Sequence, residues 1–274
     1  MLATPATSLR FGRLLLTGAA GNLGRELRPR LKAYCDVLRL SHRKPFAEPG
    51  PGEEIVLASL ENADEMMSLL DGVDAVVHMG GVSTEQPWAP ILAGNIIGMV
   101  NLYEAARLKG VRRIVFASSN HVTGFYRQNE VVDTRMPPKP DGFYGLSKAF
   151  GEDLAQLYWD RWGIETVSLR IGSSYPEPKD RRMLSTWLSY DDLERAIVAA
   201  LTAPIVGHTI LYGVSDNQSS WWDNRHAQHI GFRPQDSADA YRAEVEARQP
   251  QIDRQNPAAV FQGGAFVTAA PHGE

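Results

Sequence analysis

Short apolar runs alternate with helical patterns along most of the chain, and this rhythm restricts the fold more than any other feature. Strands that are apolar throughout are covered on both faces, so the pattern predicts a parallel sheet between two layers of helices. Right-handed crossovers then give an α/β fold with a doubly wound sheet. The expected strands are Arg13–Thr17, Asp36–Leu40, Glu54–Leu57, Asp74–Met79, Arg112–Ser118, Glu165–Gly172 and His208–Gly213; the expected helices are Asn22–Leu31, Ala63–Leu70, Ala89–Lys109, Tyr144–Trp162 and Asp191–Ala203.

Three glycines join the first strand to the first helix in the stretch LLLTGAAGNLGRELRPRL, at Gly18, Gly21 and Gly24. Glycines let the backbone turn tightly and approach a pyrophosphate, whose charge is stabilised at the amino end of the helix. An isolated triplet is as readily an ordinary turn. Here it follows a strand, opens a helix and begins a βαβ series, which predicts a Rossmann-type dinucleotide site.

Pattern changes divide the chain of 274 residues into three expected parts. Residues 1–11 are a flexible lead-in, and residues 12–172 are the dinucleotide-binding Rossmann core. Residues 173–274 complete the sheet and form a small C-terminal cap, because the pattern becomes less regular after Gly172. Substrate specificity is expected in this cap, since ligand sites form where such segments cover the edge of a sheet.

Composition narrows the class of protein. The chain is 43% hydrophobic and 22% charged with a formal net charge of −4, which is typical of a soluble globular protein. No broad basic surface is expected, so neither nucleic acid nor an anionic membrane is a predicted partner. Cys35 is the sole cysteine, which excludes an intrachain disulfide and fits a reducing compartment. No stretch approaches the roughly 20 apolar residues of a membrane span, so a cytoplasmic location is expected.

Tyr144 and Lys148, in YGLSK, lie four residues apart on one face of an expected helix. A tyrosine with a pKa near 10 is a poor base at neutral pH, but a nearby ammonium stabilises the tyrosinate. Taken alone, the pair is more readily an accidental surface pair. Together with the glycine loop upstream, it predicts an acid/base pair for interconverting a hydroxyl and a carbonyl.

Two serines end an apolar run in FASSNH. Ser119 lies at the carboxyl end of an expected central strand, where open parallel sheets bind ligands. Its hydroxyl is therefore expected to hydrogen-bond the reacting oxygen opposite Tyr144. Ser118 is interpreted as backbone support, although the sequence does not separate the two serines.

These three features together resemble the short-chain dehydrogenase/reductase superfamily, in its extended, sugar-handling branch. The chain is more closely similar to the bacterial uronate dehydrogenases, which share LLLTGAAGNLG, HMGGVSTE, FASSNH, YGLSKAFGEDLA, RMLSTWLSYDD, WWDNRHA and FQGGAF. The similarity runs from Arg13 to Val267. It implies NAD(P)-linked oxidation of D-galacturonate and D-glucuronate at C1, giving the aldaro-lactone. It also implies a homo-oligomer paired through the two long helices.

The resemblance assigns a role to each site position. Tyr144 takes the proton, Lys148 tunes the tyrosine and holds the nicotinamide ribose, and Ser119 polarises the C1 oxygen. Arg182 is expected to bind the substrate carboxylate, with Arg181 beside it a solvated charge. The remaining sugar contacts are expected at Ser83, Asn120, His121 and Ser173. The cofactor-binding set is Gly18, Gly21, Asn22, Leu23, Gly24, Ser41, His42, Arg43, Ser59, Leu60, Met79, Gly80, Gly81, Val82, Asn95, Tyr144, Lys148 and Ser174, where Asn95 is alternatively structural.

The sequence departs from the NAD-linked relatives at the adenosine ribose. Where they carry an aspartate after the second strand, this chain has His42, followed by Arg43 and Lys44. A second family aspartate is matched by Ser59. Without these two carboxylates, nothing repels the 2′-phosphate of NADP at this position, and the two cations attract that phosphate. The sequence therefore favours NADP over NAD, with a solvated loop and NAD as the alternative.

Two other functions fit the same fold. A sugar-nucleotide epimerase or dehydratase normally carries a larger C-terminal part than the residues that follow Gly172. A non-catalytic NAD(P)-sensing protein typically loses the tyrosine and lysine pair, which this chain keeps. His226 and His229 have a His-x-x-His spacing, but no carboxylate or cysteine set accompanies them, so no metal is expected.

Overall fold

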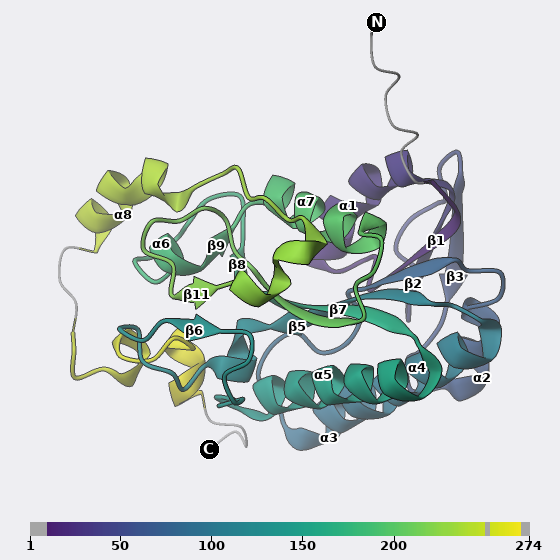
Figure 1. Ribbon diagram of the computed structural model, residues 1–274, viewed down its shortest axis with the longest axis horizontal. Coiled ribbons are helices and arrows are strands. Elements are labelled where there is room, and N and C mark those ends of the chain that lie inside the picture. The colour runs from purple at the N-terminus through teal and green to yellow at the C-terminus, as the bar shows by residue number, and fades with distance from the viewer. Residues whose placement is uncertain (1–9, 250–252, 270–274) are drawn as a thin grey trace, which may run out of the picture.

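The computed structural model describes residues 10–249 and 253–269 (Figure 1). Seven parallel strands form the central sheet in the order β10-β7-β5-β4-β1-β2-β3, which confirms the predicted Rossmann-type fold. The chain reverses its direction of strand addition between β1 and β4, so their carboxyl ends border the crevice where such sheets bind ligands. The strands are β1 (Phe11–Thr17), β2 (Cys35–His42), β3 (Glu53–Leu57), β4 (Ala75–His78), β5 (Arg113–Ser119), β7 (Glu165–Ile171) and β10 (His208–Gly213).

Helices cover both faces of the sheet (Figure 1). The helices α1 (Asn22–Leu31) and α7 (Tyr190–Thr202) cover one face, while α2 (Ala63–Leu69), α4 (Gly98–Lys109) and α5 (Phe143–Trp162) cover the other. Successive strand residues point to opposite faces. Leu14 and Leu16 accordingly belong to the apolar cluster under α1 and α7, whereas Leu15 belongs to the cluster under the other three helices. This two-sided core holds the strand ends rigidly.

The long helix expected over Ala89–Lys109 is not continuous. It consists of α3 (Trp88–Ile91), a π-helical segment (Leu92–Ile97) and α4. The π turn places the Asn95 amide against the backbone of Val82, with hydrogen bonds of 2.7 and 3.0 Å. Such bulges commonly mark functional positions. The other expected strands and helices agree with the structure to within about two residues.

The C-terminal part adds β10 to the sheet and builds short elements beside the strand ends. The strand β6 (Val132–Asp133) pairs with β11 (Trp222–Asp223), and β8 (Ser173–Ser174) pairs with β9 (Trp187–Leu188). Two short helices, α6 (Met183–Thr186) and α8 (Arg242–Arg248), lie on the same side of the molecule (Figure 1). Short 3-10 turns cover Lys32–Tyr34, Asn120–Thr123, Arg225–Ile230, Ala238–Tyr241, Pro257–Ala259 and Gly264–Thr268.

Most of the predicted lead-in, residues 1–9, lies outside the described residues, and Phe11 already belongs to β1. In the described part of the chain, no helix combines the length and apolarity needed to cross a membrane.

Candidate active site

The glycine loop packs directly against the loop that follows β4. Gly18 has a φ of +67°, and a Cβ added there would lie 2.6 Å from the Met79 carbonyl carbon. A Cβ on Gly24 would lie 2.2 Å from the Gly18 carbonyl oxygen. Gly21 precedes α1 and donates its N–H to that same oxygen at 2.9 Å. Side chains are thus excluded from a cradle at the amino end of α1, a geometry that fits a dinucleotide pyrophosphate.

A buried polar pair beneath this cradle was not expected from the sequence. The Thr17 hydroxyl bonds His78 Nδ1 at 2.7 Å and accepts the Gly80 N–H at 3.1 Å. Burial lowers the pKa of His78 to about 3, with repulsion from Lys148 adding to it. A neutral His78 therefore ties the end of β1 to the loop after β4.

Asn95 links that loop to the helix that carries Tyr144. Its Oδ1 accepts the Val82 N–H, while its Nδ2 donates to the Val82 carbonyl and to Ser147 Oγ. The Ser147 hydroxyl in turn donates to the Tyr144 carbonyl at 2.7 Å. Gly81, with a φ of +116°, leaves the space for this amide, since a Cβ would lie 2.6 Å from Asn95 Oδ1. Asn95 thus has a structural role in joining these two segments, and its expected cofactor contact stays a prediction.

Tyr144 and Lys148 are both buried on α5 and face the end of β5. Lys148 donates from Nζ to the Ala117 carbonyl at 2.8 Å and lies 5.6 Å from the centre of the Tyr144 ring. Burial raises the pKa of Tyr144 to about 12, opposed by the hydrogen bond with Ser119. Burial also lowers the pKa of Lys148 to about 8. The apolar surroundings therefore make each charged form less stable, and the expected tyrosinate needs further positive charge beside it.

The two serines of FASSNH have different environments. Ser119 ends β5, its Oγ accepts the His121 N–H at 3.2 Å, and its hydroxyl bonds Tyr144. Ser118 points away from that site and donates to Glu152 at 2.5 Å. Ser119 thus lies beside Tyr144, whereas the Ser118 hydroxyl bonds the Glu152 side chain rather than the backbone that the sequence interpretation assigned to it.

Arg182 has hydrogen-bond partners on three segments of the chain. Its Nε donates to the Gln262 carbonyl at 2.6 Å and its Nη1 to Ser173 Oγ at 3.1 Å. The Asn120 amide accepts from Arg182 Nη2 at 2.8 Å and donates to the Ile171 carbonyl at 3.0 Å. No carboxylate of the described residues lies within ion-pair distance of Arg182, and its hydrogen-bond partners are neutral. Burial lowers the pKa of Arg182, and the more distant Asp180 and Asp141 oppose that shift. Arg181 instead donates from Nε to the Gln249 carbonyl and pairs with Glu246, so its side chain has protein partners and is not the solvated charge that the sequence interpretation expected.

The remaining expected sugar contacts lie in different settings. His121 is buried beside Tyr144, with 5.8 Å between the ring centres, and bonds Asp141. Ser83 is exposed in the loop after β4. In the described structure, the buried Ser174 hydroxyl has no hydrogen-bond partner, which leaves it free for a ligand group.

The expected adenosine contacts lie at the ends of β2 and β3. Ser41 is buried, and its carbonyl accepts the Ala19 N–H at 3.1 Å. His42 Nδ1 lies 3.2 Å from the Lys44 N, while the Arg43 and Lys44 side chains are exposed and form no ion pair with any described residue. The Ser59 N–H donates to Glu65 at 2.7 Å. Of the other expected cofactor residues, Asn22 and Leu23 begin α1, and Leu60 packs against Gly80.

Sequence reasoning missed several residues that hold this site together. Glu85 accepts the N–H groups of Phe143 and Tyr144 at 2.9 Å each, and so caps α5 next to Tyr144. Asp141 bonds His121, and Phe266 stacks on the His121 ring at 3.7 Å. Their partners lie far away in the sequence, so no local pattern marks them. FQGGAF was singled out only by the family resemblance.

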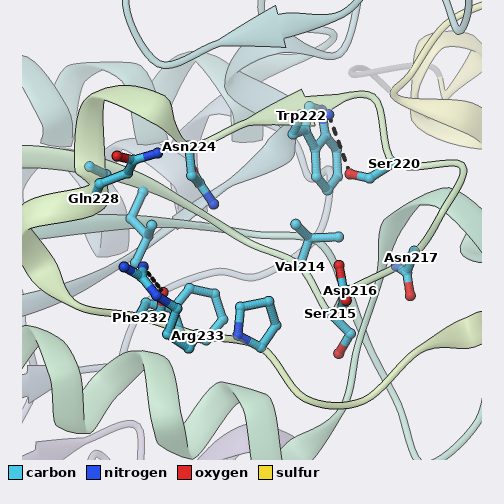
Figure 2. A pocket seen from close by; sticks show the side chains of 13 residues that line it. Val214, Ser215, Asp216, Asn217, Ser220, Trp222, Asn224, Gln228, Phe232 and Arg233 are labelled. Atoms are coloured by element: carbon cyan, nitrogen blue, oxygen red, sulfur yellow. Dashed lines mark hydrogen bonds between the residues drawn. The ribbon is translucent and has the colours of Figure 1, made fainter.

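A separate cavity of about 210 Å³ lies in the C-terminal part and does not contain Tyr144 (Figure 2). Val214, Trp222 and Phe232 contribute to its wall. Two amides that line the cavity already have protein partners. Asn224 is hydrogen-bonded to the Tyr212 backbone, and Asn217 to the backbones of Trp187 and Ala238. The chemistry-bearing residues therefore gather at the ends of β4, β5 and β7 rather than in this cavity. In the described part of the chain, no cluster of His, Cys, Asp or Glu is arranged to hold a metal.

Comparison with known proteins agrees with this geometry. The chain matches the sequence model of the NAD dependent epimerase/dehydratase family over residues 14–189. It is 56% identical over 266 residues to a uronate dehydrogenase of Pseudomonas putida, covering 97% of this chain and 99% of that one. It is also similar to a crystal structure of a uronate dehydrogenase from Agrobacterium tumefaciens, a tyrosine-to-alanine mutant complexed with NAD. That likeness has a TM-score of 0.94 and 46% identity, and covers 96% of this chain and 100% of that one. The chain therefore belongs to the NAD dependent epimerase/dehydratase family and, within it, to the uronate dehydrogenases.

Proposed function

We propose that the chain oxidises D-galacturonate and D-glucuronate at C1 and releases the aldaro-lactone. The observation that carries this proposal is that proton-handling groups and a group able to bind a carboxylate lie on the same side of the crevice. Ser119, Tyr144 and Lys148 gather at the end of β5, and a guanidinium without a carboxylate partner in the described chain lies nearby on Arg182. These groups fit a substrate that carries both a hydroxyl, which Tyr144 and Ser119 would contact, and a carboxylate, which Arg182 would bind.

The protein's own groups handle the proton. In the cyclic form of a uronic acid, C1 carries a hemiacetal hydroxyl. The Tyr144 phenolate accepts the proton of that hydroxyl, and Ser119 donates a hydrogen bond to the same oxygen. An oxidised nicotinamide held near Tyr144 and Lys148 would supply the acceptor for the C1 hydride, and its positive charge would favour the phenolate. Loss of one proton and one hydride converts the hemiacetal carbon directly to a lactone carbonyl.

Arg182 binds the carboxylate of the substrate in this proposal. Its planar guanidinium suits two parallel hydrogen bonds to a carboxylate. Ser173, Asn120 and the Gln262 carbonyl fix the side chain through three separate atoms, so little flexibility remains to be lost on binding. Ser83 and His121 contact sugar hydroxyls.

The test is an assay of the intact protein with each uronate and each oxidised nicotinamide cofactor, followed by absorbance of the reduced cofactor. We expect reduction with both uronates in the wild type. Tyr144→Phe should abolish turnover while cofactor binding, measured by calorimetry, stays within about threefold, because only the proton acceptor is removed. No reduction by the wild type would reject the function, and a Tyr144→Phe variant with more than about a tenth of the rate would reject the base.

The cradle formed by Gly18, Gly21 and Gly24 fits a dinucleotide, and we propose a preference for NADP over NAD. Two observations support it. The end of β2 carries His42 in place of a carboxylate, and Arg43 and Lys44 are exposed cations without an ion-pair partner in the described chain. Electrostatic attraction to a 2′-phosphate therefore meets no opposing acid at the carboxyl end of β2, where Ser41 and His42 lie.

Comparing kcat/KM for the two cofactors at saturating galacturonate tests this preference. Arg43→Ala should lower kcat/KM for NADP about tenfold or more and change kcat/KM for NAD little, since a charge-assisted contact is lost only with the phosphate. A wild-type preference for NAD of about tenfold would reject NADP as the favoured cofactor and leave the uronate chemistry standing.

We further propose that the chain works as a homo-oligomer in the cytoplasm, with no nucleic-acid or membrane partner and no metal. The apolar side chains exposed on α4 and α5 support the oligomer. Burial raises the pKa of the Cys35 thiol, which fits an unreactive cysteine in a reducing compartment.

A further inference from the structure

Asp141 and His121 form a buried pair at the edge of the site. The distance between His121 Nδ1 and Asp141 Oδ2 is 2.6 Å, and the Asp141 side chain is 0% exposed. We propose that Asp141 is a positioning residue that holds His121 with its Nε2 atom as a hydrogen-bond acceptor for a hydroxyl of the sugar. The inference rests on the proposed function and specifies which kind of substrate group this part of the site requires.

The backbone around Asp141 is shaped to keep the carboxylate in place. A Cβ added to Gly124 or to Gly263 would lie 1.9 Å from Asp141 Oδ2, and one added to Gly145 would lie 3.2 Å from Oδ1. These glycines come from the turn after β5, from the first turn of α5 and from the C-terminal segment. Glycines on three separate segments therefore leave the space that this carboxylate fills beside His121, and any side chain there would displace it.

The pair is costly for folding alone, which argues that the carboxylate has a task. Asp141 Oδ1 is buried and has no hydrogen-bond partner among the described residues. A buried carboxylate normally gains several donors, and one left with a single partner lowers stability. Buried polar groups that are incompletely satisfied are characteristic of positions where function outweighs stability.

The hydrogen bond to Asp141 determines which nitrogen of His121 carries the proton. Burial lowers the pKa of His121, although Asp141 opposes this shift, and a lowered pKa favours the neutral ring. Arg182, which lowers that pKa, and Glu85, which raises it, are the other charged groups that act on the ring. A neutral ring beside a carboxylate keeps its proton on Nδ1, so Nε2 is an acceptor.

The plane of the ring is fixed as well. Phe266 stacks on His121 with 3.7 Å between ring centres and 23° between planes, and Tyr144 meets the ring edge-on. An acceptor held in this way beside Tyr144 pairs with a hydroxyl that donates. It discriminates against a substrate in which that hydroxyl is replaced by hydrogen or by fluorine, since neither donates.

Steady-state kinetics of Asp141→Asn is the first test. We expect the KM for uronates to rise roughly 10- to 100-fold, while kcat and the KM for the cofactor change by less than about threefold, because a contact to a non-reacting hydroxyl is equal in ground and transition states. Asp133→Asn is the matched control, since Asp133 lies 3.5 Å from His226 in β6, outside the site. An unchanged uronate KM in Asp141→Asn, or a fall in kcat alone, would overturn the proposal.

A set of uronates, each lacking one hydroxyl or carrying fluorine in its place, gives the second test. Wild type should lose at least about tenfold in kcat/KM with one member of the set, and this loss should shrink to under about threefold in His121→Phe and in Asp141→Asn. If the penalty for every position is the same in all three proteins, the acceptor role is wrong. Wild type that oxidises no uronate at all would instead reject the proposed function, so the two failures are distinguishable.

The tautomer itself is measurable on the wild type, which avoids any effect of a substitution on folding. The ¹⁵N spectrum of histidine-labelled protein at neutral pH should show a ring with a protonated Nδ1 and an unprotonated Nε2, and His121→Phe should remove that pair of signals. A His121 ring protonated on Nε2 would overturn the proposal even if the kinetics agreed.

Discussion

Tyr144 and Ser119 illustrate how single contacts adjust the acidity of a proton acceptor. Burial raises the pKa of Tyr144 to about 12, and the hydrogen bond from Ser119 opposes that rise. Oxidation needs the deprotonated form, so kcat/KM should rise with pH throughout the range from about pH 6 to about pH 9, which lies below that pKa. Removing the hydrogen bond in Ser119→Ala raises the pKa further, so the rise should move to higher pH and kcat/KM at each pH in this range should be lower.

The pH profile of kcat/KM for galacturonate in the two proteins measures this shift. Ser118→Ala is the control, because Ser118 bonds Glu152 rather than Tyr144. A profile that is flat over this range in wild type would contradict a tyrosine as the acceptor. A profile that moves to lower pH in Ser119→Ala would contradict the role of Ser119.

Arg182 is held by neutral partners, and its charge is available for the substrate. Arg182→Ala should raise the KM for uronates roughly 10- to 150-fold, because a charge-assisted hydrogen bond contributes about 1.5–3 kcal/mol. Arg181→Ala is the matched control and should leave that KM nearly unchanged, since Arg181 contacts Gln249 and Glu246. Uronate kinetics that are unaffected in Arg182→Ala would place the carboxylate site elsewhere.

Sequence spacing predicts residues whose role depends on a local pattern. The i, i+4 pair of Tyr144 and Lys148 and the strand-end position of Ser119 are of this kind, and the structure brings all three to the end of β5. Glu85 and Asp141 belong to no local sequence pattern that would predict their roles. Their partners are defined by the fold, as when Glu85 reaches the amino end of α5, 58 residues away.

At the scale of elements, a buried polar network ties α5 to the sheet. Glu152 of α5 forms two hydrogen bonds with Arg170 of β7, at 2.9 and 2.7 Å, and Arg170 donates to Tyr212 of β10 at 3.0 Å. Glu152→Gln should lower the free energy of unfolding by about 3–5 kcal/mol, because it leaves the Arg170 charge buried without its counterion.

Urea unfolding followed by circular dichroism measures that loss. Glu244→Gln is the matched control, because Glu244 pairs with Arg248 on the surface of α8 at 3.6 Å, and it should cost less than about 1 kcal/mol. Equal stabilities of Glu152→Gln and wild type would show that the ion pair contributes nothing to the docking of α5.

The π-helical segment shows why an element can be predicted in position but not in form. Residues 89–109 have the apolar periodicity of one helix, and the sequence predicts one. The Asn95 side chain and the Val82 backbone satisfy each other only if the helix widens by one residue at that point. That contact joins segments 13 residues apart, and periodicity within one segment does not contain it.

For the whole molecule, the sequence predicts the sheet and its helices because short, largely apolar runs alternate with helical patterns, a signal that each element carries in its own sequence. The arrangement of the C-terminal part is different. Its order depends on contacts such as the Tyr212 ring stacked on Trp222 and the Trp222 Nε1 bonded to Gln262 at 2.9 Å. Those pairs join distant segments, so the sequence predicts a cap there without its internal structure.

The surface of α4 and α5 carries the last prediction, the assembly of the whole molecule. Leu146 and Leu157 are 11 residues apart, so they lie on one side of α5. Ile97, the last residue of the π-helical segment, and Leu108 of α4 have the same spacing. All four side chains are exposed, as are Val100 and Trp162. An apolar surface that extends over two neighbouring helices is characteristic of a buried interface. A second copy of the chain would cover this surface across a two-fold axis.

Light scattering at about micromolar concentration should therefore give a mass of two or a multiple of two chains, each of 30.3 kDa. Leu157→Glu should shift the protein toward 30.3 kDa, because it buries a charge without a partner at the interface. Val131→Glu is the matched control, since Val131 is an exposed apolar residue just before β6, away from α4 and α5, and it should keep the wild-type mass. Wild type that scatters as a single chain, or a Leu157→Glu variant with unchanged mass, would exclude this face as the interface.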